Sequence, residues 1–167
     1  MKKFGIKGTR TLKVFHLILV MMWVIGVAGM WSLSWIKPEN PDGLAMLLDC
    51  IMWLDSTLTI PGAILTVVTG IIYGIFTNWG FFKFRWITVK WIIGITVILV
   101  GTFYFHPTAL AAIEVVKTSP GTAMCDPIVT HAITVAQSTS CLQAAALVFL
   151  VAISVFKPWN KKSSKKG

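Results

Sequence analysis

Residues 12–35 read LKVFHLILVMMWVIGVAGMWSLSW, and this stretch decides the class of the protein. It follows a basic N-terminal segment and holds about twenty apolar or small residues, the length with which an α-helix crosses a ~30 Å hydrocarbon core. A secretory signal peptide has a shorter apolar region and a small-x-small cleavage site, and the stretch shows neither feature. We therefore expect a retained membrane-spanning helix over 12–35.

Three further spans are expected, at about 58–76, 87–105 and 127–156. The third span is predicted to stop at His106, because the residue before a proline is pushed out of helical geometry. The fourth begins with Asp126 and Pro127, a favourable N-cap and first helical residue.

Residues 44–76 are longer than one span requires, and their first third contains Asp49 and Asp55. We therefore expect a short amphipathic helix at 43–54, at or above the outer membrane interface. The Pro61-Gly62 pair is expected to kink or loosen the start of the span that follows.

Charged residues separate along the chain into two sets that alternate between the expected spans. The basic set flanks the N-terminus, the middle connection and the tail, and comprises Lys2, Lys3, Lys7, Arg10, Lys13, Lys83, Arg85, Lys90, Lys157, Lys161, Lys162, Lys165 and Lys166. The acidic set belongs to the other two connections and comprises Glu39, Asp42, Asp49, Asp55, Glu114 and Asp126, with only Lys37 and Lys117 beside them. Lys and Arg near span ends stay on the cytoplasmic side. The sequence thus predicts a single-domain, all-α four-helix bundle over 1–167, with both termini in the cytoplasm, in a cell membrane such as the bacterial cytoplasmic membrane.

The composition supports a membrane protein, with 56% hydrophobic and 13% charged residues. The net charge of +9 does not indicate nucleic-acid binding, because the basic residues flank spans and no groove-reading motif accompanies them. The tail at 157–167 is expected either to rest on anionic lipid headgroups or to serve as a solvated terminus that helps to set the topology. Phosphate-binding loops, dinucleotide fingerprints and nucleophile elbows are absent from the sequence.

Small and polar residues recur at helical spacing in the fourth span. They are His131, Thr134, Ser138, Cys141 and Ala145. Because lipid disfavours polar side chains, we expect this stripe to face the interior of the bundle.

Ionisable residues within spans are expected at two depths. His16 and Lys90 lie one turn inside the cytoplasmic ends of their spans, whereas His106 and His131 lie at outer ends, again at similar depth. Candidate neighbours on the outer side are Asp55, Asp126 and Tyr104. The two levels are about 25 Å apart, so one small ligand cannot touch both. Each group also has a simpler interpretation: a lysine that snorkels to the interface, or a histidine that only hydrogen-bonds locally.

Imidazole nitrogen binds iron, copper and zinc, which makes His16, His106 and His131 the candidate metal ligands. The three cysteines contain no Cys-x-x-Cys pair, so a structural zinc site is not indicated. Cys50 and Cys125 both lie on the outer side, and the sequence leaves open whether they form a disulfide.

Two motifs resemble known membrane families. Leu12-Lys13-Val14-Phe15-His16-Leu17, followed by Trp23 and Gly26, is similar to the first-helix pattern of the four-helix copper-resistance D membrane domain. Trp86-Ile87-Thr88-Val89-Lys90 is similar to the third-helix pattern of the J-type protoporphyrinogen oxidases, in which a first-helix histidine and this lysine are the functional pair. In size, topology and histidine content the chain also resembles the heme-sensing membrane protein A family, which is linked to heme tolerance and oxidative-stress defence.

The resemblance implies a membrane protein that binds b-type heme non-covalently, for heme sequestration and tolerance or for heme-linked electron transfer. His16 would be a heme ligand and Lys90 a partner for a propionate. His131 and His106 would hold an outer heme and His16 an inner one, or only one of these sites would be occupied. Tyr104 and Ser138 are further candidate cofactor contacts. The oxidase pattern after Trp23 is not matched, which leaves any heme-dependent oxidoreductase activity open. Membrane lipids, a redox partner or a second copy of the chain are the expected partners.

Two other functions remain open at this point. One is a small transporter for metal ions or solutes, with His16, Lys90, Asp55 and His131 along a polar path. The other is a structural or assembly subunit without a cofactor, whose interior is merely packed.

Overall fold

The computed structural model describes residues 4–77, 80–81 and 84–156, and these residues contain helices and no strand. The elements in chain order are α1 (Ile6–Leu33), α2 (Pro41–Leu54), η1 (Asp55–Thr59), α3 (Ile60–Phe76), α4 (Arg85–Val100), η2 (Gly101–Phe105), α5 (His106–Thr118), η3 (Ala123–Cys125) and α6 (Pro127–Phe156). The all-helical fold class is confirmed.

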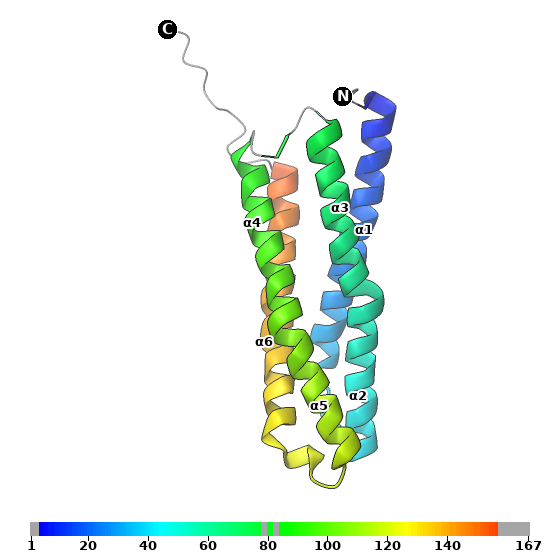
Figure 1. Ribbon diagram of the computed structural model, residues 1–167, viewed down its shortest axis with the longest axis vertical. Coiled ribbons are helices and arrows are strands. Elements are labelled where there is room, and N and C mark those ends of the chain that lie inside the picture. The colour runs from blue at the N-terminus through cyan, green and yellow to red at the C-terminus, as the bar shows by residue number, and fades with distance from the viewer. Residues whose placement is uncertain (1–3, 78–79, 82–83, 157–167) are drawn as a thin grey trace.

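Four long helices result, because α2, η1 and α3 form one continuous helix and α4, η2 and α5 form another (Figure 1). These helices are Ile6–Leu33, Pro41–Phe76, Arg85–Thr118 and Pro127–Phe156, and each is long and apolar enough to cross a membrane. The described residues thus contain four candidate membrane spans, which indicate a multi-pass membrane protein. The start of α1 and the end of α6 lie at the same end of the bundle (Figure 1).

The expected helix end at residue 105 is wrong, whereas the helix expected at 43–54 is present as α2 and continues through η1 into α3. Two π turns explain why the chain stays helical at both places. The N–H of Ile60 bonds to the carbonyl of Asp55, and the N–H of His106 bonds to the carbonyl of Gly101, in each case five residues earlier. The two widened turns lie just before Pro61 and Pro107. In a regular α-helix a proline ring clashes with the backbone carbonyl four residues earlier, and the wider turn moves that carbonyl aside. His106 consequently keeps helical dihedral angles, φ −59° and ψ −49°, and the chain stays helical through both prolines.

Helix packing differs between the two halves of the bundle. At the end where α1 begins and α6 ends, α1 packs on α3 and α6, and α4 also packs on α6. At the opposite end, α2 packs on α5, and α5 packs on α6. Two glycines bring α1 and α3 into backbone contact, because Gly62 lies against Trp23 and Gly26 lies against Thr59. Apolar side chains fill the centre between these helices, including Val27, which is fully buried.

The relative heights of the helices follow from three contacts. Gly29 of α1 packs against Leu54 of α2. The Nε2 of Gln137 on α6 donates to the carbonyl of Ser34 at 2.8 Å. Gln143 of α6 lies against Gly101, at the junction of α4 and η2. Each residue advances an α-helix by about 1.5 Å along its axis. From these three contacts, the height of any residue along the bundle axis can therefore be compared with that of a residue on another helix.

Exposed aromatic side chains mark one level of the bundle. Trp31 on α1, Trp53 on α2 and Tyr104 in η2 are 38%, 63% and 49% exposed. The three interhelical contacts described above place these residues at nearly the same height along the bundle. Trp and Tyr concentrate at membrane interfaces. From Lys13 to Trp31 is about 27 Å along α1, close to the ~30 Å thickness of a hydrocarbon core. We therefore place one membrane interface at the level of these aromatic residues and the other near Lys13.

Beyond that aromatic level, residues 34–51 and 107–137 form the end of the bundle opposite the start of α1, which we call the outer cap. The continuous helices extend into it by roughly 15 Å. A separate cluster of buried apolar side chains holds it together: Leu44, Leu48, Ala112, Val116, Ala123, Val129 and Ala132. The expectation that residues 43–54 lie at or above the outer interface stays a prediction, and the segment continues into α3.

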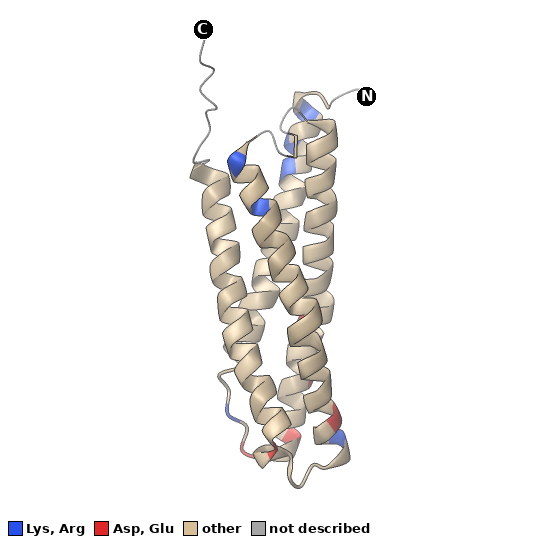
Figure 2. Ribbon diagram, turned by 60° about the vertical axis from the view of Figure 1, so that its left-hand side comes forward, with Lys and Arg blue, Asp and Glu red and all other residues tan. Residues whose placement is uncertain are grey.

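Charge separates along the bundle as the sequence indicates. Figure 2 shows most of the described basic residues near the end where α1 begins, and most of the acidic residues at the outer cap together with two cations. Those two cations are Lys37 and Lys117. Asp55 is the exception among the acidic residues, because it lies in η1, further along the bundle. Lys2, Lys3, Lys83 and the tail at 157–167 lie outside the described residues.

Candidate functional site

His16 is held by a hydrogen bond to the neighbouring helix. Its Nδ1 lies 2.7 Å from the Oγ1 of Thr69 on α3. The Thr69 hydroxyl also lies 2.8 Å from the carbonyl of Leu65 and 3.0 Å from that of Thr66. We assign its proton to one of these carbonyls, and with this assignment the hydroxyl accepts from Nδ1–H of the imidazole. Nε2 then carries the free lone pair of a neutral ring. The ring also meets Tyr73 edge-on, with centroids 5.8 Å apart, and the Tyr73 hydroxyl donates to the carbonyl of Thr9 at 3.2 Å.

Lys90 lies at the same height as His16, on α4. Its Nζ lies 5.8 Å from the centre of the Trp86 ring. Lys90 is half-buried. One turn further along α4, a Cβ added at Gly94 would meet no atom within 4 Å, so the space beside this face of the helix is open. We call His16, Thr69, Tyr73 and Lys90 the inner site.

A second polar pair joins the two π turns near the aromatic level. The Nδ1 of His106 lies 3.2 Å from Oδ2 of Asp55. The Asp55 side chain is 7% exposed, whereas that of His106 is 35% exposed, so the imidazole connects a buried carboxylate with the surface of the bundle. The expectation that Asp55 lies near His106 is confirmed. The hydroxyl of Thr59, in the same π turn, is buried without a hydrogen-bond partner among the described residues.

His131 does not join His106, contrary to expectation. Gln143 lies against Gly101, which places His106 level with Ser138 and leaves His131 about 10 Å further towards the outer end. The mismatch arises because the helix continues through Pro107, so that His106 is no longer at a span end. An outer site shared by these two histidines is not supported by this geometry.

The polar stripe of α6 faces outward, so the expectation that it lines the bundle interior is wrong. His131, Thr134, Ser138, Cys141 and Ala145 are all exposed. The buried face of α6 instead carries Val135, Ala136, Thr139, Ser140, Gln143 and Leu147. The argument from lipid failed because the hydroxyls of Thr134 and Ser138 donate to carbonyls of their own helix and need no partner inside the bundle. His131 and Thr134 also lie in the outer cap.

Other candidate residues are placed as follows. Tyr104 is exposed at the aromatic level, about 25 Å from the height of His16. The described parts of the chain contain no group of three or more His, Cys, Asp or Glu that could hold a metal ion. Cys50, Cys125 and Cys141 all carry free thiols, so the disulfide that the sequence left open is not formed.

The sequence revealed neither Tyr73 nor Thr69 as a site residue. Thr69 is an ordinary threonine in an apolar helix, and only the packing of α3 on α1 brings its hydroxyl to His16. The chain matches no protein-family model, no curated protein and no solved structure.

Proposed function

We propose that this protein binds one b-type heme non-covalently at the inner site, for heme sequestration and tolerance or for heme-linked electron transfer. Both chain ends would lie in the cytoplasm of a cell whose membrane the four helices cross, which places the inner site near the cytoplasmic face. The observation that carries the proposal is the hydrogen bond between His16 and Thr69, at 2.7 Å.

That hydrogen bond selects the imidazole nitrogen that is available to a ligand. Because Nδ1 donates to the hydroxyl of Thr69, Nε2 keeps its lone pair and the ring is held in one orientation. Metal-binding histidines in proteins are typically oriented through their other ring nitrogen in this way. The ring is also flanked by Tyr73, which restricts its rotation.

The remaining residues of the inner site fit a porphyrin with acidic side arms. Lys90 supplies a cation at the height of His16, where it would meet a propionate. The open space beside Gly94 leaves that face of α4 free for a flat ring. Bound heme would supply a redox-active iron, while the protein provides one axial imidazole and a largely apolar surrounding. His106 is about 25 Å away along the bundle and would supply no second ligand.

The other two functions receive less support. Between the heights of Lys90 and Asp55 the centre of the bundle is filled by Trp23, Val27, Val97 and Leu147. An ion moving between the two polar pairs would have to cross this apolar layer, which weighs against a permease. A subunit without a cofactor would not require an imidazole with a free nitrogen beside a half-buried lysine.

Absorption spectroscopy tests the proposal. Protein purified in a mild detergent is titrated with hemin and its spectrum is recorded in the oxidised and reduced states. We expect a Soret band that saturates at one heme per chain and is lost in His16→Ala. The matched control is His131→Ala, which removes an exposed imidazole of the outer cap and should leave the titration unchanged.

The absence of a Soret band in the unaltered protein would contradict heme binding and leave the structural subunit as the better description. A Soret band that survives His16→Ala and disappears in His131→Ala would identify His131 of the outer cap as the heme ligand. It would refute heme binding at the inner site.

A further inference from the structure

A cavity of about 380 Å³ lies on the flank of the outer cap, between the connection from α1 to α2 and the outer part of α6. Ile36, Leu44 and Ile133 are among its apolar lining residues, and Ser34, Lys37 and Gln137 are among its polar ones. It is separate from the inner site, because none of the residues of that site lines it. Ser34 lies just outside the level of Trp31, so the cavity is at the height where lipid headgroups and water meet.

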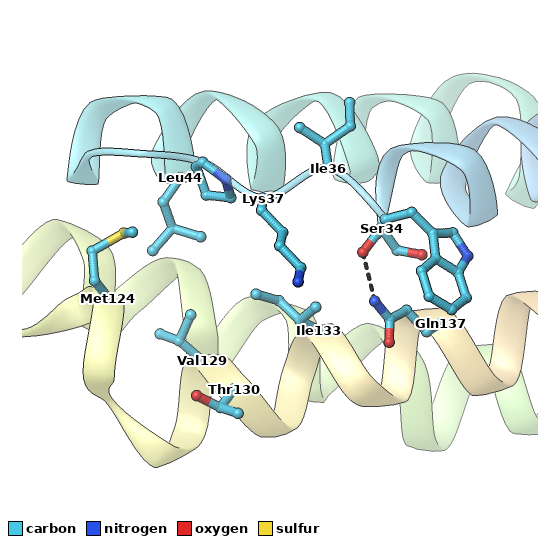
Figure 3. Close-up of a pocket in the computed structure, with 11 residues that line it drawn as sticks. Ser34, Ile36, Lys37, Leu44, Met124, Val129, Thr130, Ile133 and Gln137 are labelled. Carbon is cyan, nitrogen blue, oxygen red and sulfur yellow. Dashed lines mark hydrogen bonds between the residues drawn. The ribbon is translucent and has the colours of Figure 1, made fainter.

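Lys37 directs its side chain into this cavity. Figure 3 shows the ammonium between the connecting loop and α6, pointing towards Ile133. The same loop carries Glu39, and α2 begins with Asp42 in its first turn, yet Lys37 makes no ion pair with an acidic side chain among the described residues. Lys37 is exposed, and its ammonium, unpaired among the described residues, lies beside apolar lining residues such as Ile133, where it is available to a bound anion.

The wall next to Lys37 offers a fixed polar surface beside the apolar one. One N–H of the Gln137 amide is held by the carbonyl of Ser34 at 2.8 Å, which orients the side chain and leaves its other N–H and its carbonyl oxygen unoccupied by any described residue. The hydroxyl of Thr130 also lines the cavity and donates to its own helix at 3.1 Å, so it can still accept a hydrogen bond.

We propose that this cavity binds an anionic amphiphile, that is, one carboxylate or phosphate group on a short apolar chain. Lys37 is the counter-charge for the anionic group, Gln137 is a further polar contact, and Leu44, Val129 and Ile133 receive the apolar part. The ligand chemistry is shared by a free carboxylic acid and by the headgroup region of an anionic phospholipid in the outer leaflet.

The experiment compares two lysines of the outer cap. Full-length protein in a nonionic detergent is titrated with sodium octanoate by calorimetry, with Lys37→Gln as the test variant and Lys117→Gln as the matched control. Lys117 is an exposed cation of the same cap that does not line the cavity. We expect the affinity of Lys37→Gln to fall by about tenfold or more, the loss of a charge-assisted contact, and that of Lys117→Gln to stay unchanged. Octanol, which lacks the charge, should bind far more weakly than octanoate.

A second variant keeps the lysine and fills the space. Ile133→Trp should abolish octanoate binding while far-ultraviolet circular dichroism shows an unchanged helix content. Equal binding by the unaltered protein and both test variants would overturn the proposal, as would binding of octanol as tight as that of octanoate.

A parallel arm identifies the source of the anion. Protein extracted from phosphatidylglycerol vesicles is examined by native mass spectrometry before and after addition of octanoate. Phosphatidylglycerol that is retained by the unaltered protein, lost in Lys37→Gln and displaced by octanoate assigns the site to a lipid headgroup. Octanoate binding without retained lipid assigns it to a free carboxylate. If neither octanoate nor phosphatidylglycerol binds the unaltered protein, the proposal is refuted.

Discussion

The backbone contact between α1 and α3 at Gly62 gives a test of the fold. A Cβ added at Gly62 would lie 2.8 Å from the backbone nitrogen of Trp23 and 3.0 Å from its Cα, whereas ordinary van der Waals contact begins at 3.4 Å. Because the contacted atoms belong to a helix backbone, they cannot rotate away. The two helices must therefore separate locally by the difference, which is 0.6 Å. We predict that Gly62→Ala destabilises the protein.

The magnitude follows from the size of that separation. A gap of about 0.5–1 Å forfeits a quarter to a half of the dispersion energy of the atom pairs that it opens. Overfilling a well-packed interior typically costs about 1–3 kcal/mol. For a protein of this size each kcal/mol lowers the melting temperature by about 2–4 °C, so Gly62→Ala should melt about 2–12 °C below the unaltered protein.

The assay is unfolding in detergent micelles, by heating and by titration with sodium dodecyl sulfate, followed by circular dichroism. Gly94→Ala is the matched control, because its added Cβ would meet no atom within 4 Å. It should unfold within about 0.5 kcal/mol of the unaltered protein. If Gly62→Ala were as stable as the unaltered protein, or if Gly94→Ala were equally destabilising, the close approach of α1 to α3 would be wrong.

Three further predictions concern the inner site, the polar pair and the topology. Thr69→Val removes the hydroxyl that orients the imidazole of the inner site and should weaken heme binding about 10- to 100-fold, measured by the hemin titration. Asp55→Asn removes the charge from a buried hydrogen bond and should lower the free energy of unfolding by about 1–3 kcal/mol, measured in the detergent titration. In a variant whose only cysteine is Cys125, a membrane-impermeant maleimide should label intact cells, because this exposed thiol lies in the outer cap.

Each of these predictions has a control of the same chemistry. Thr66→Val alters the same helix at a hydroxyl that has no partner among the described residues, so heme binding should persist. If Thr66→Val weakened heme binding as much as Thr69→Val, a specific role of Thr69 would be contradicted. Asp49→Asn alters an exposed carboxylate and should leave the free energy of unfolding nearly unchanged. If Asp49→Asn and Asp55→Asn were equally destabilising, a stabilising role of the buried Asp55–His106 pair would be contradicted. A cysteine-free protein with Ser163→Cys should be labelled only after permeabilisation, and labelling of intact cells would contradict cytoplasmic chain ends.

Much of the fold is predictable because the length of an apolar stretch is a local property. The spans at 12–35 and 127–156 correspond to helices Ile6–Leu33 and Pro127–Phe156. The prolines misled the prediction, since local geometry favours a helix end before each one. The π turns at Asp55–Thr59 and Gly101–Phe105 relieve the clash while the helix continues, and their stability comes from the packing of neighbouring helices, which no local rule reports.

The candidate site was predictable only in part. His16 and Lys90 were recognised as ionisable groups at one depth, and their heights agree with that expectation. The outward direction of the stripe that contains Ser138 was missed, because helical spacing identifies which residues share a face and does not identify what that face meets. The hydroxyl of Thr69 gave no signal, since threonine is common in membrane helices and its partner is 53 residues away in the chain.

The amino-acid sequence by itself determined the helical class, the number of long helices and the separation of basic from acidic ends, because hydropathy and charge act through the length and the flanks of each segment. The tertiary structure alone decided that Thr69 lies against His16 and that Lys37 enters a cavity, and it confirmed the expected neighbourhood of Asp55 and His106. These contacts join residues that are distant in the chain, and they depend on helix register and rotation. Register and rotation are set by close approaches such as Gly62 against Trp23, where a difference of less than 1 Å selects one packing over another.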